Sequence, residues 1–424
     1  MKTKKIKDLD LEVYFEKLNN GLEVYIIPSN NVNNTYVTYS AKYGGMHNEF
    51  YVNDEKVTVP MGIAHFLEHK MFETEDGVDV FNFFQERGSN CNANTNSKKT
   101  TYLFSGPNAF YENLEYLLSY VESPYFTDEN VNKEKGIIEQ EIMMYKDNPY
   151  SRMYEDLMYN LFVNHPLKYP TIGTKESINK ITKEDLYTCY NAFYHPSNMF
   201  VVVTGNVDPK KTMELIKKHE DKRKIDKINV RKIECLDETN LVALDNEVLK
   251  MDVTIPKLAI SYKIDISNID YLDINKIYSY LINVVDLKVG PTSLFTEKLR
   301  LENLITDTFD VTCIKANKHI ILIVDTETDH PDEVLERLKE EMKDLTVTFK
   351  EFERRKKTGI SSLHFMSDNI YKINSKIVND IMEYDDVDYD PISTVKSYDY
   401  NKALKLIKDI NLDNYSVIKI MPEN

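Results

Sequence analysis

The stretch that decides how this sequence is interpreted is Pro60–Glu73, PMGIAHFLEHKMFE, in which two histidines and a glutamate interrupt an apolar run. On a helix, residues four apart share one face with Cβ atoms about 5–6 Å apart, so His65 and His69 can bind one zinc ion. Glu68 lies at the edge of that face, where a general base for the attacking water belongs. The alternative is a core helix with two hydrogen-bonded histidines, which the HxxEH spacing makes the weaker interpretation.

A catalytic zinc ion also needs a third protein ligand and an open position for water. The segment Asn132–Pro149, NKEKGIIEQEIMMYKDNP, offers Glu134 and Glu141, which are seven residues apart and therefore share a helical face. Two such carboxylates are on their own more typical of a solvated acidic face. Ile138 and Ile142 make this segment too apolar for that, and buried carboxylates need a cation or another partner. We therefore expect the missing ligand here.

The bulk composition limits the class of protein and its partners. A chain of 424 residues is too long for one ordinary core, which predicts two domains or more. Its 69 acidic against 53 basic residues give a formal charge of −16, which argues against nucleic acid and anionic membranes as partners. No apolar run is long enough to span a bilayer. Acidic residues follow the N-terminal lysines where an export signal would need an apolar core.

The cysteines indicate a compartment. Cys91, Cys189, Cys235 and Cys313 are widely spread along the chain and form no CxxC pair. In a large chain this pattern is typical of isolated reduced thiols, and not of a disulfide framework or a thiolate zinc site. We therefore expect a cytoplasmic protein.

Strand and helix patterns follow a similar order in both halves of the chain. The first half begins with alternating apolar residues over 11–29, typical of a hairpin, and ends with a helix and a buried strand over 183–205. A similar order recurs beyond a charged run at about 220–238. We therefore expect an α+β fold of two structurally similar domains, each a mostly antiparallel sheet packed with helices. The N-terminal domain, residues 1–225, would hold the metal site, and the domain of residues 226–424 would lack one.

Five motifs stand in a defined order along the first half. They are GIAHFLEHKMF (62–72), GSNCNANT (88–95), EKGIIEQE (134–141), GTKESI (173–178) and FYHPSNMFVVVTGNV (193–207). In this order and spacing they resemble the insulinase/pitrilysin family of zinc metallopeptidases, the inverzincins. The resemblance is close over residues 15–220, and the chain length is similar to that of the family's half-size subunits, which include mitochondrial processing peptidases and bacterial relatives. It implies that the duplicated unit forms half of a clamshell.

The resemblance also implies roles for individual residues. Glu141 would complete the zinc site with the two histidines, and Glu134 would be a catalytic acidic residue beside it. Asn92 and Ala93 match the family's strand that pairs with an extended peptide substrate. Without the resemblance, Asn92 would be interpreted as an ordinary turn residue.

The second half departs from the family's pattern. Members often use an arginine and a tyrosine there to bind substrate and stabilise the oxyanion. In Gly290–Phe309, Arg300 stands where the arginine is expected, but Asp307 stands in place of the tyrosine, and an acid opposes a developing negative charge. We therefore expect Arg300 to bind substrate and a related subunit to supply the Arg/Tyr pair in a heterodimer. A homodimer stays open.

The sequence thus predicts a zinc metalloendopeptidase that hydrolyses unfolded peptides or short polypeptides, as the catalytic half of a dimer. One alternative is a non-catalytic peptide-binding or scaffold subunit of a peptidase-like complex. Family members of that kind typically lose the HxxEH residues, which this chain retains. Another alternative is a processing enzyme that matures one dedicated peptide by the same chemistry.

Overall fold

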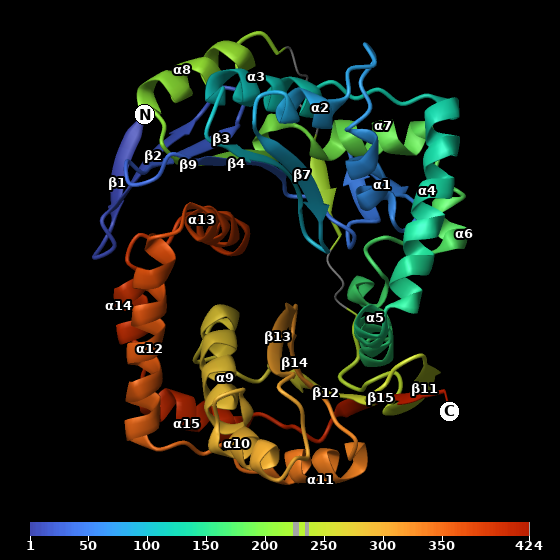
Figure 1. Ribbon diagram of the computed structural model, residues 1–424, viewed down its shortest axis with the longest axis vertical. Coiled ribbons are helices and arrows are strands. Elements are labelled where there is room, and N and C mark those ends of the chain that lie inside the picture. Colours follow the sequence, from blue (N-terminus) through green and yellow to red (C-terminus); the bar gives the residue numbers. More distant parts are fainter. Residues whose placement is uncertain (224–228, 234–236, 424) are drawn as a thin grey trace. The chain divides into compact units, whose positions relative to one another are not determined.

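The structure is a computed structural model that describes residues 1–223, 229–233 and 237–423 (Figure 1). It divides into two compact units. The first comprises Met1–Ile142, Pro170–Ile233 and Ser361–Ser393, and the second comprises Met143–Tyr169, Glu234–Ile360 and Thr394–Asn424. The expected boundary between residues 225 and 226 lies outside the described residues. Each compact unit contains segments from both sides of this boundary.

A seven-stranded sheet forms the centre of the first unit, in the order β1-β2-β3-β9-β4-β8-β7. Neighbouring strands are antiparallel except β3 and β9, which are parallel. The strands are β1 (Lys2–Ile6), β2 (Leu11–Lys17), β3 (Glu23–Pro28), β4 (Thr35–Ala41), β7 (Asn90–Thr95), β8 (Thr100–Gly106) and β9 (Met199–Gly205). Every residue of β9, MFVVVTG, is buried, as expected for a strand covered on both faces.

Helices and a small antiparallel sheet complete the first unit. The small sheet has the order β10-β5-β6, with β5 (Glu49–Val52), β6 (Glu55–Thr58) and β10 (Val230–Lys232). The helices are α1 (Ile63–Lys70), α2 (Val80–Gln85), α3 (Phe110–Val121), α4 (Asp128–Asp147), α6 (Lys175–Ile178), α7 (Lys183–Phe193), α8 (Pro209–Glu220) and α13 (Ile370–Tyr384), with a short 3₁₀ helix at Pro196–Asn198. The last residues of α4 lie beyond Ile142 and belong to the second unit.

The second unit is built on a five-stranded sheet in the order β11-β15-β12-β14-β13. Its strands are β11 (Asn246–Met251), β12 (Lys257–Asp265), β13 (Phe309–Ala316), β14 (His319–Glu327) and β15 (Tyr415–Pro422). Its helices are α5 (Pro149–Leu161), α9 (Ile274–Val289), α10 (Leu294–Leu301), α11 (Pro331–Met342), α12 (Phe349–Ser367), α14 (Pro391–Lys396) and α15 (Tyr400–Asp409), with a 3₁₀ helix at Pro166–Lys168. Among all the helices that the structure describes, none is long and apolar enough to cross a membrane.

The two sheets repeat one topology. In the first unit the order β3-β9-β4-β8-β7 begins with a parallel pair and continues antiparallel. In the second unit β11-β15-β12-β14-β13 follows the same rule, strand for strand. The expected α+β class, with antiparallel-rich sheets packed with helices in a duplicated arrangement, is confirmed.

Helices α5 and α13 each pack on a sheet whose strands come from the other half of the sequence. Helix α13 contacts β4 and β9 and therefore belongs to the first unit, whereas α5 contacts β12 and β15 and belongs to the second. Polar anchors hold α13 in place: Thr38 Oγ1 donates to Asn374 Oδ1 at 2.8 Å, and Asn374 Nδ2 donates to the Val202 carbonyl at 3.0 Å. A buried amide with both groups paired adds specificity to an otherwise apolar contact.

Candidate metal centre

Helix α1 carries the two histidines on the side that faces away from the core. Ile63, Phe66 and Leu67 are fully buried, and α1 packs on β7, β8 and α7. His65 and His69 lie on the other, partly buried face, with the two ring centroids 4.5 Å apart. The expected helix and the shared face of the imidazoles are therefore both present.

A pair of glycines determines how α1 begins. Gly62 caps the helix with φ at 88°, a conformation that strains other residues. A Cβ atom on Gly62 would lie 2.5 Å from the Ile172 carbonyl oxygen, and one on Gly173 would lie 2.7 Å from the Met61 carbonyl oxygen. The chain at Gly173 thus packs directly on the start of α1, and side chains at either position would displace the helix that carries the histidines.

Helix α4 brings a carboxylate to the histidines. Val131, Ile138 and Ile142 are buried on one side of α4, and this orients Glu141 toward α1. Its Oε1 lies 3.8 Å from His65 Nε2 and its Oε2 lies 3.5 Å from His69 Nε2. One donor atom from each of the three residues lies within 4.8 Å of the others.

Glu134 lies two turns before Glu141 and contacts the far side of the His69 ring. Its Oε1 is 2.9 Å from His69 Nδ1, and its side chain is 8% exposed. A hydrogen bond from Nδ1–H to this carboxylate leaves the lone pair on Nε2, the atom that faces Glu141. Glu134 therefore orients the ring and does not itself point at the three-donor cluster.

The electrostatics of the two imidazoles differ. Burial, with a smaller contribution from His69, lowers the pKa of His65 to about 3, so His65 is neutral and its nitrogen lone pair is available. Burial also lowers the pKa of His69, but the hydrogen bond that it donates to Glu134 and the charges of Glu134, Glu141 and Glu68 together raise it above its ordinary value. Three carboxylates around one imidazole create a site that favours positive charge.

These donors fit a zinc ion. A tetrahedral ion with ligands at about 2.0–2.1 Å separates its donors by roughly 3.3 Å, close to the distances of 3.5 and 3.8 Å between Glu141 and the imidazole nitrogens. Two imidazoles and one carboxylate are donor types of catalytic zinc sites, which keep a fourth position open.

Glu68 lies on the same helix next to the cluster and is 8% exposed. Burial raises its pKa, and the charge of Glu141 adds to this, while a hydrogen bond from Thr95 opposes it. Thr95 Oγ1 donates to Glu68 Oε2 at 2.5 Å. A raised carboxyl pKa favours proton transfer near neutral pH.

Two segments of the chain match known protein families. Residues 55–175 match the family described as "Insulinase (Peptidase family M16)", and residues 180–358 match the one described as "Peptidase M16 inactive domain". The chain belongs to the M16 insulinase family. His65, Glu68, His69 and Glu141 all lie within the first matched segment.

Several known M16 proteins are similar to this chain. An "Uncharacterized zinc protease YmfH" of Bacillus subtilis is 42% identical over 260 residues, which are 61% of this chain and 60% of that protein. An "Uncharacterized zinc protease" of Rickettsia felis is 31% identical over 199 residues, 45% of this chain and 46% of that protein. The chain thus matches about half to three fifths of these relatives' lengths. A crystal structure of an M16-like peptidase from Alicyclobacillus acidocaldarius has a TM-score of 0.92 at 29% identity and covers 99% of this chain and 100% of that one.

Two residues of this M16 site were not singled out from the sequence. Thr95 belongs to the motif over 88–95. Strand alternation alone shows only that Ala93 and Thr95 share a face. The contact between Thr95 and Glu68 depends on strand pairing, which is a tertiary feature. Lys70 directly follows His69, and its Nζ lies 2.6 Å from Glu73 Oε2 and 3.9 Å from Glu134 Oε2. A charged residue inside an apolar helical run was the available signal.

The remaining candidate residues lie on two different units. Asn92 and Ala93 are on β7, an edge strand of the seven-stranded sheet, and within the described part of the chain β7 pairs with β8 alone. Asn92 is exposed, and its Oδ1 accepts a hydrogen bond from the Ala93 backbone N–H at 2.9 Å. Arg300 belongs to α10 in the second unit. Its Nη1 donates to the Pro291 carbonyl at 2.7 Å, and its Nε lies 3.8 Å from Asp307 Oδ1.

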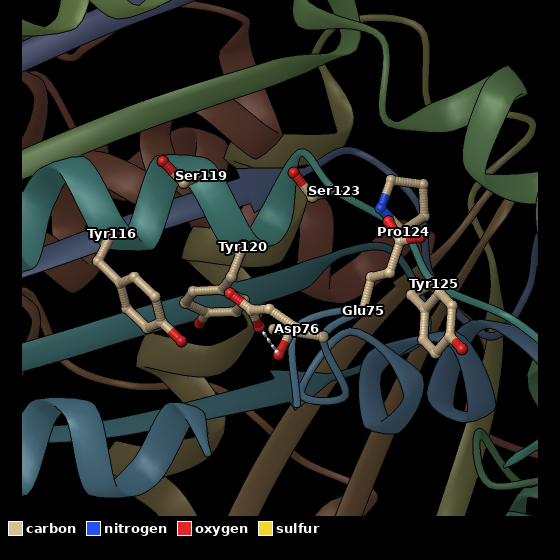
Figure 2. Close-up of a pocket in the computed structure, with 9 residues that line it drawn as sticks. Glu75, Asp76, Tyr116, Ser119, Tyr120, Ser123, Pro124 and Tyr125 are labelled. Atoms are coloured by element: carbon tan, nitrogen blue, oxygen red, sulfur yellow. Dashed lines mark hydrogen bonds between the residues drawn. The ribbon is translucent and has the colours of Figure 1, made fainter. Parts of the chain in front are cut away.

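A separate hollow lies beside the loop that follows α1 (Figure 2). Its volume is about 580 Å³, and it is lined by Thr74, Glu75, Asp76, Tyr116, Ser119, Tyr120, Ser123, Pro124 and Tyr125. Thr74 Oγ1 and the Val78 N–H both donate to Asp76 Oδ1, which ties the loop into a local turn. None of the candidate metal, base or substrate-binding residues lines this hollow.

Proposed function

We propose that this chain is a zinc-dependent endopeptidase that hydrolyses unfolded peptides. The observation that carries the proposal is the meeting of His65, His69 and Glu141 beside a buried Glu68. The names of the M16 relatives, which are described as zinc proteases, support it. The match to an inactive M16 domain covers 180–358 and contains none of these four residues.

In the proposed mechanism, His65, His69 and Glu141 hold the zinc ion. Bound zinc supplies a Lewis acid that polarises the scissile carbonyl and makes water more acidic. Glu68 takes a proton from the attacking water and then delivers it to the leaving amine. Because Thr95 engages Oε2, we assign the proton transfer to Oε1. The hydrogen bond from Thr95 also prevents the base from rotating away.

The edge of β7 is the proposed place for the substrate. An exposed strand edge presents unpaired backbone N–H and C=O groups, with which an extended peptide can pair. Asn92 and Ala93 lie on this strand. Backbone pairing with the strand would hold the peptide, and contacts with the peptide's side chains would determine which peptides are accepted. An unfolded peptide fits this mode because it has free backbone groups to offer.

We further propose that the active enzyme is a heterodimer in the cytoplasm. Arg300 pairs with Asp307, and this supports a related subunit as the source of an Arg/Tyr pair. The free thiols Cys91, Cys189 and Cys313 support a reducing compartment. Assays of the purified chain with and without proteins co-purified from the host test the partner: full zinc-dependent cleavage by the chain alone contradicts a heterodimer.

Metal analysis and peptide cleavage test the proposed activity. We expect about one zinc per chain and cleavage of a fluorogenic peptide library that a chelator abolishes. His65→Ala should lose the zinc, whereas Glu68→Gln should keep it and lose cleavage. A chain that contains no zinc but binds peptides equally well would contradict the proposal and favour a scaffold subunit.

A further inference from the structure

Lys70 is a buried cation at the end of α1. Its side chain is 0% exposed, which is rare for lysine unless the ammonium is paired. A lysine in an apolar site commonly extends its ammonium to water, and complete burial excludes that here. The ammonium instead lies between two carboxylates, Glu73 Oε2 at 2.6 Å and Glu134 Oε2 at 3.9 Å.

The two carboxylates differ in what else they do. Glu73 is 35% exposed, so water already solvates its charge. Glu134 is 8% exposed, and its other oxygen, Oε1, lies 2.9 Å from His69 Nδ1. Glu134 therefore lies between an imidazole on one oxygen and an ammonium on the other.

A buried charge is costly unless a group of opposite charge lies beside it. An ionised carboxylate is the stronger hydrogen-bond acceptor for an imidazole N–H. Lys70 supplies the positive charge. It directly follows His69, so the same helix, α1, carries both side chains. Replacing Lys70 by an uncharged side chain would leave Glu134 facing His69 with its negative charge poorly compensated.

We propose that Lys70 is a positioning residue for the metal centre. Through Glu134 it keeps the His69 ring oriented with Nε2 toward Glu141. The ion pairs of Lys70 are with Glu73 and Glu134 and not with the three donors. This inference rests on the proposed function, because it concerns the affinity of the same site for zinc.

A double-mutant cycle on zinc affinity tests the proposal without an activity assay. The variants are Lys70→Met, Glu134→Gln and the two combined, with affinity measured by competition against a chromogenic chelator. Methionine is unbranched and uncharged and is one atom shorter than lysine, and glutamine keeps an oxygen for His69 without the charge of Glu134. We expect Lys70→Met to weaken zinc binding about tenfold, the lower range for residues that support a metal ligand. In the Glu134→Gln background, Lys70→Met should cause no further loss of zinc affinity.

Control variants separate charge from packing. Glu73→Gln removes the solvated partner of the same ammonium and should leave zinc affinity within about twofold of wild type. Lys70→Arg keeps the charge and should recover part of the lost affinity. If Lys70→Met does not fold, Lys70→Gln carries the same expectation.

The outcomes are distinct. Wild-type affinity in Lys70→Met, or a full additional loss in the Glu134→Gln background, overturns the role of Lys70. If the wild-type chain binds no zinc, the proposed function is overturned, and this inference, which rests on it, is overturned as well. Wild-type zinc binding with an unaffected Lys70→Met protein overturns this inference alone.

Discussion

The Nδ1 atom of His69 lies 2.9 Å from Oε1 of Glu134, two helical turns before Glu141 on α4. Helix α4 thus contacts both sides of one imidazole, with Glu134 at Nδ1 and Glu141 at Nε2. The first contact selects the tautomer, and the second brings in the third donor. One helix therefore both orients a ligand and completes the cluster.

Glu134→Ala should weaken zinc binding by about 10–100-fold, the usual effect of removing a carboxylate that orients a metal-binding histidine. The measurement is chelator competition on the folded protein, checked by circular dichroism. Glu129→Ala is the matched control, because Glu129 is an exposed glutamate in the first turn of the same helix. Equal affinities in the two variants would contradict the role assigned to Glu134.

Thr95→Val should reduce kcat by about 10-fold or more while leaving zinc content unchanged. Valine keeps the shape of the side chain but removes the hydroxyl that donates to Glu68 Oε2, and hydrogen bonds to charged groups contribute about 1.5–3 kcal/mol. Steady-state cleavage of a fluorogenic peptide gives kcat and KM separately. Thr95→Ser keeps the donor and should retain most of the activity; a serine variant as slow as the valine variant would show that the methyl group matters instead.

Gly62→Ala should destabilise the protein and weaken zinc binding, because a Cβ at this position would lie 2.5 Å from the Ile172 carbonyl oxygen. Gly77→Ala is the control: Gly77 has φ of 70° but no atom within 4 Å of an added Cβ. We expect about 1 kcal/mol of strain for Gly77→Ala and a clearly larger loss for Gly62→Ala in thermal unfolding. Equal losses in the two variants would show that close packing at Gly62 is unimportant.

Asp325→Asn should stabilise the second unit at pH 7.5 but not at pH 3.5. Asp325 faces Asp310 directly across the β13–β14 pair, and burial, then the Asp310 charge, raises its pKa to about 6. Because the folded pKa exceeds the unfolded value, this group stabilises the fold at low pH, and the contribution is lost as pH rises through 6. The cost above pH 7 is about 2–3 kcal/mol, which asparagine avoids.

Thermal unfolding of wild type and Asp325→Asn across this pH range measures the difference. Asp310→Asn should give a smaller gain at pH 7.5, since burial is the larger cause of the raised pKa and would remain. A constant difference between wild type and Asp325→Asn at all pH values would contradict this account.

Much of the candidate site could be predicted because its signals are local. The i, i+4 spacing of His65 and His69 and the seven-residue spacing of Glu134 and Glu141 each follow from helix periodicity. The resemblance to M16 proteins then selected Glu141 as the donor, and the structure brings these side chains together. Thr95 and Lys70 were not predicted, because their partners depend on strand pairing and on the packing of α4 against α1.

The sequence by itself determined the elements, the duplicated α+β class and the residues able to bind zinc, because each depends on periodicity and residue chemistry within a short segment. Tertiary structure alone decided which oxygen of Glu134 meets His69, that Thr95 anchors Glu68, and that α5 and α13 pack on the sheets of the opposite halves. Those relationships join segments far apart in the sequence, as between Thr38 and Asn374, which are 336 residues apart. Local propensity carries no information about such contacts, because burial and steric fit in the assembled core select them.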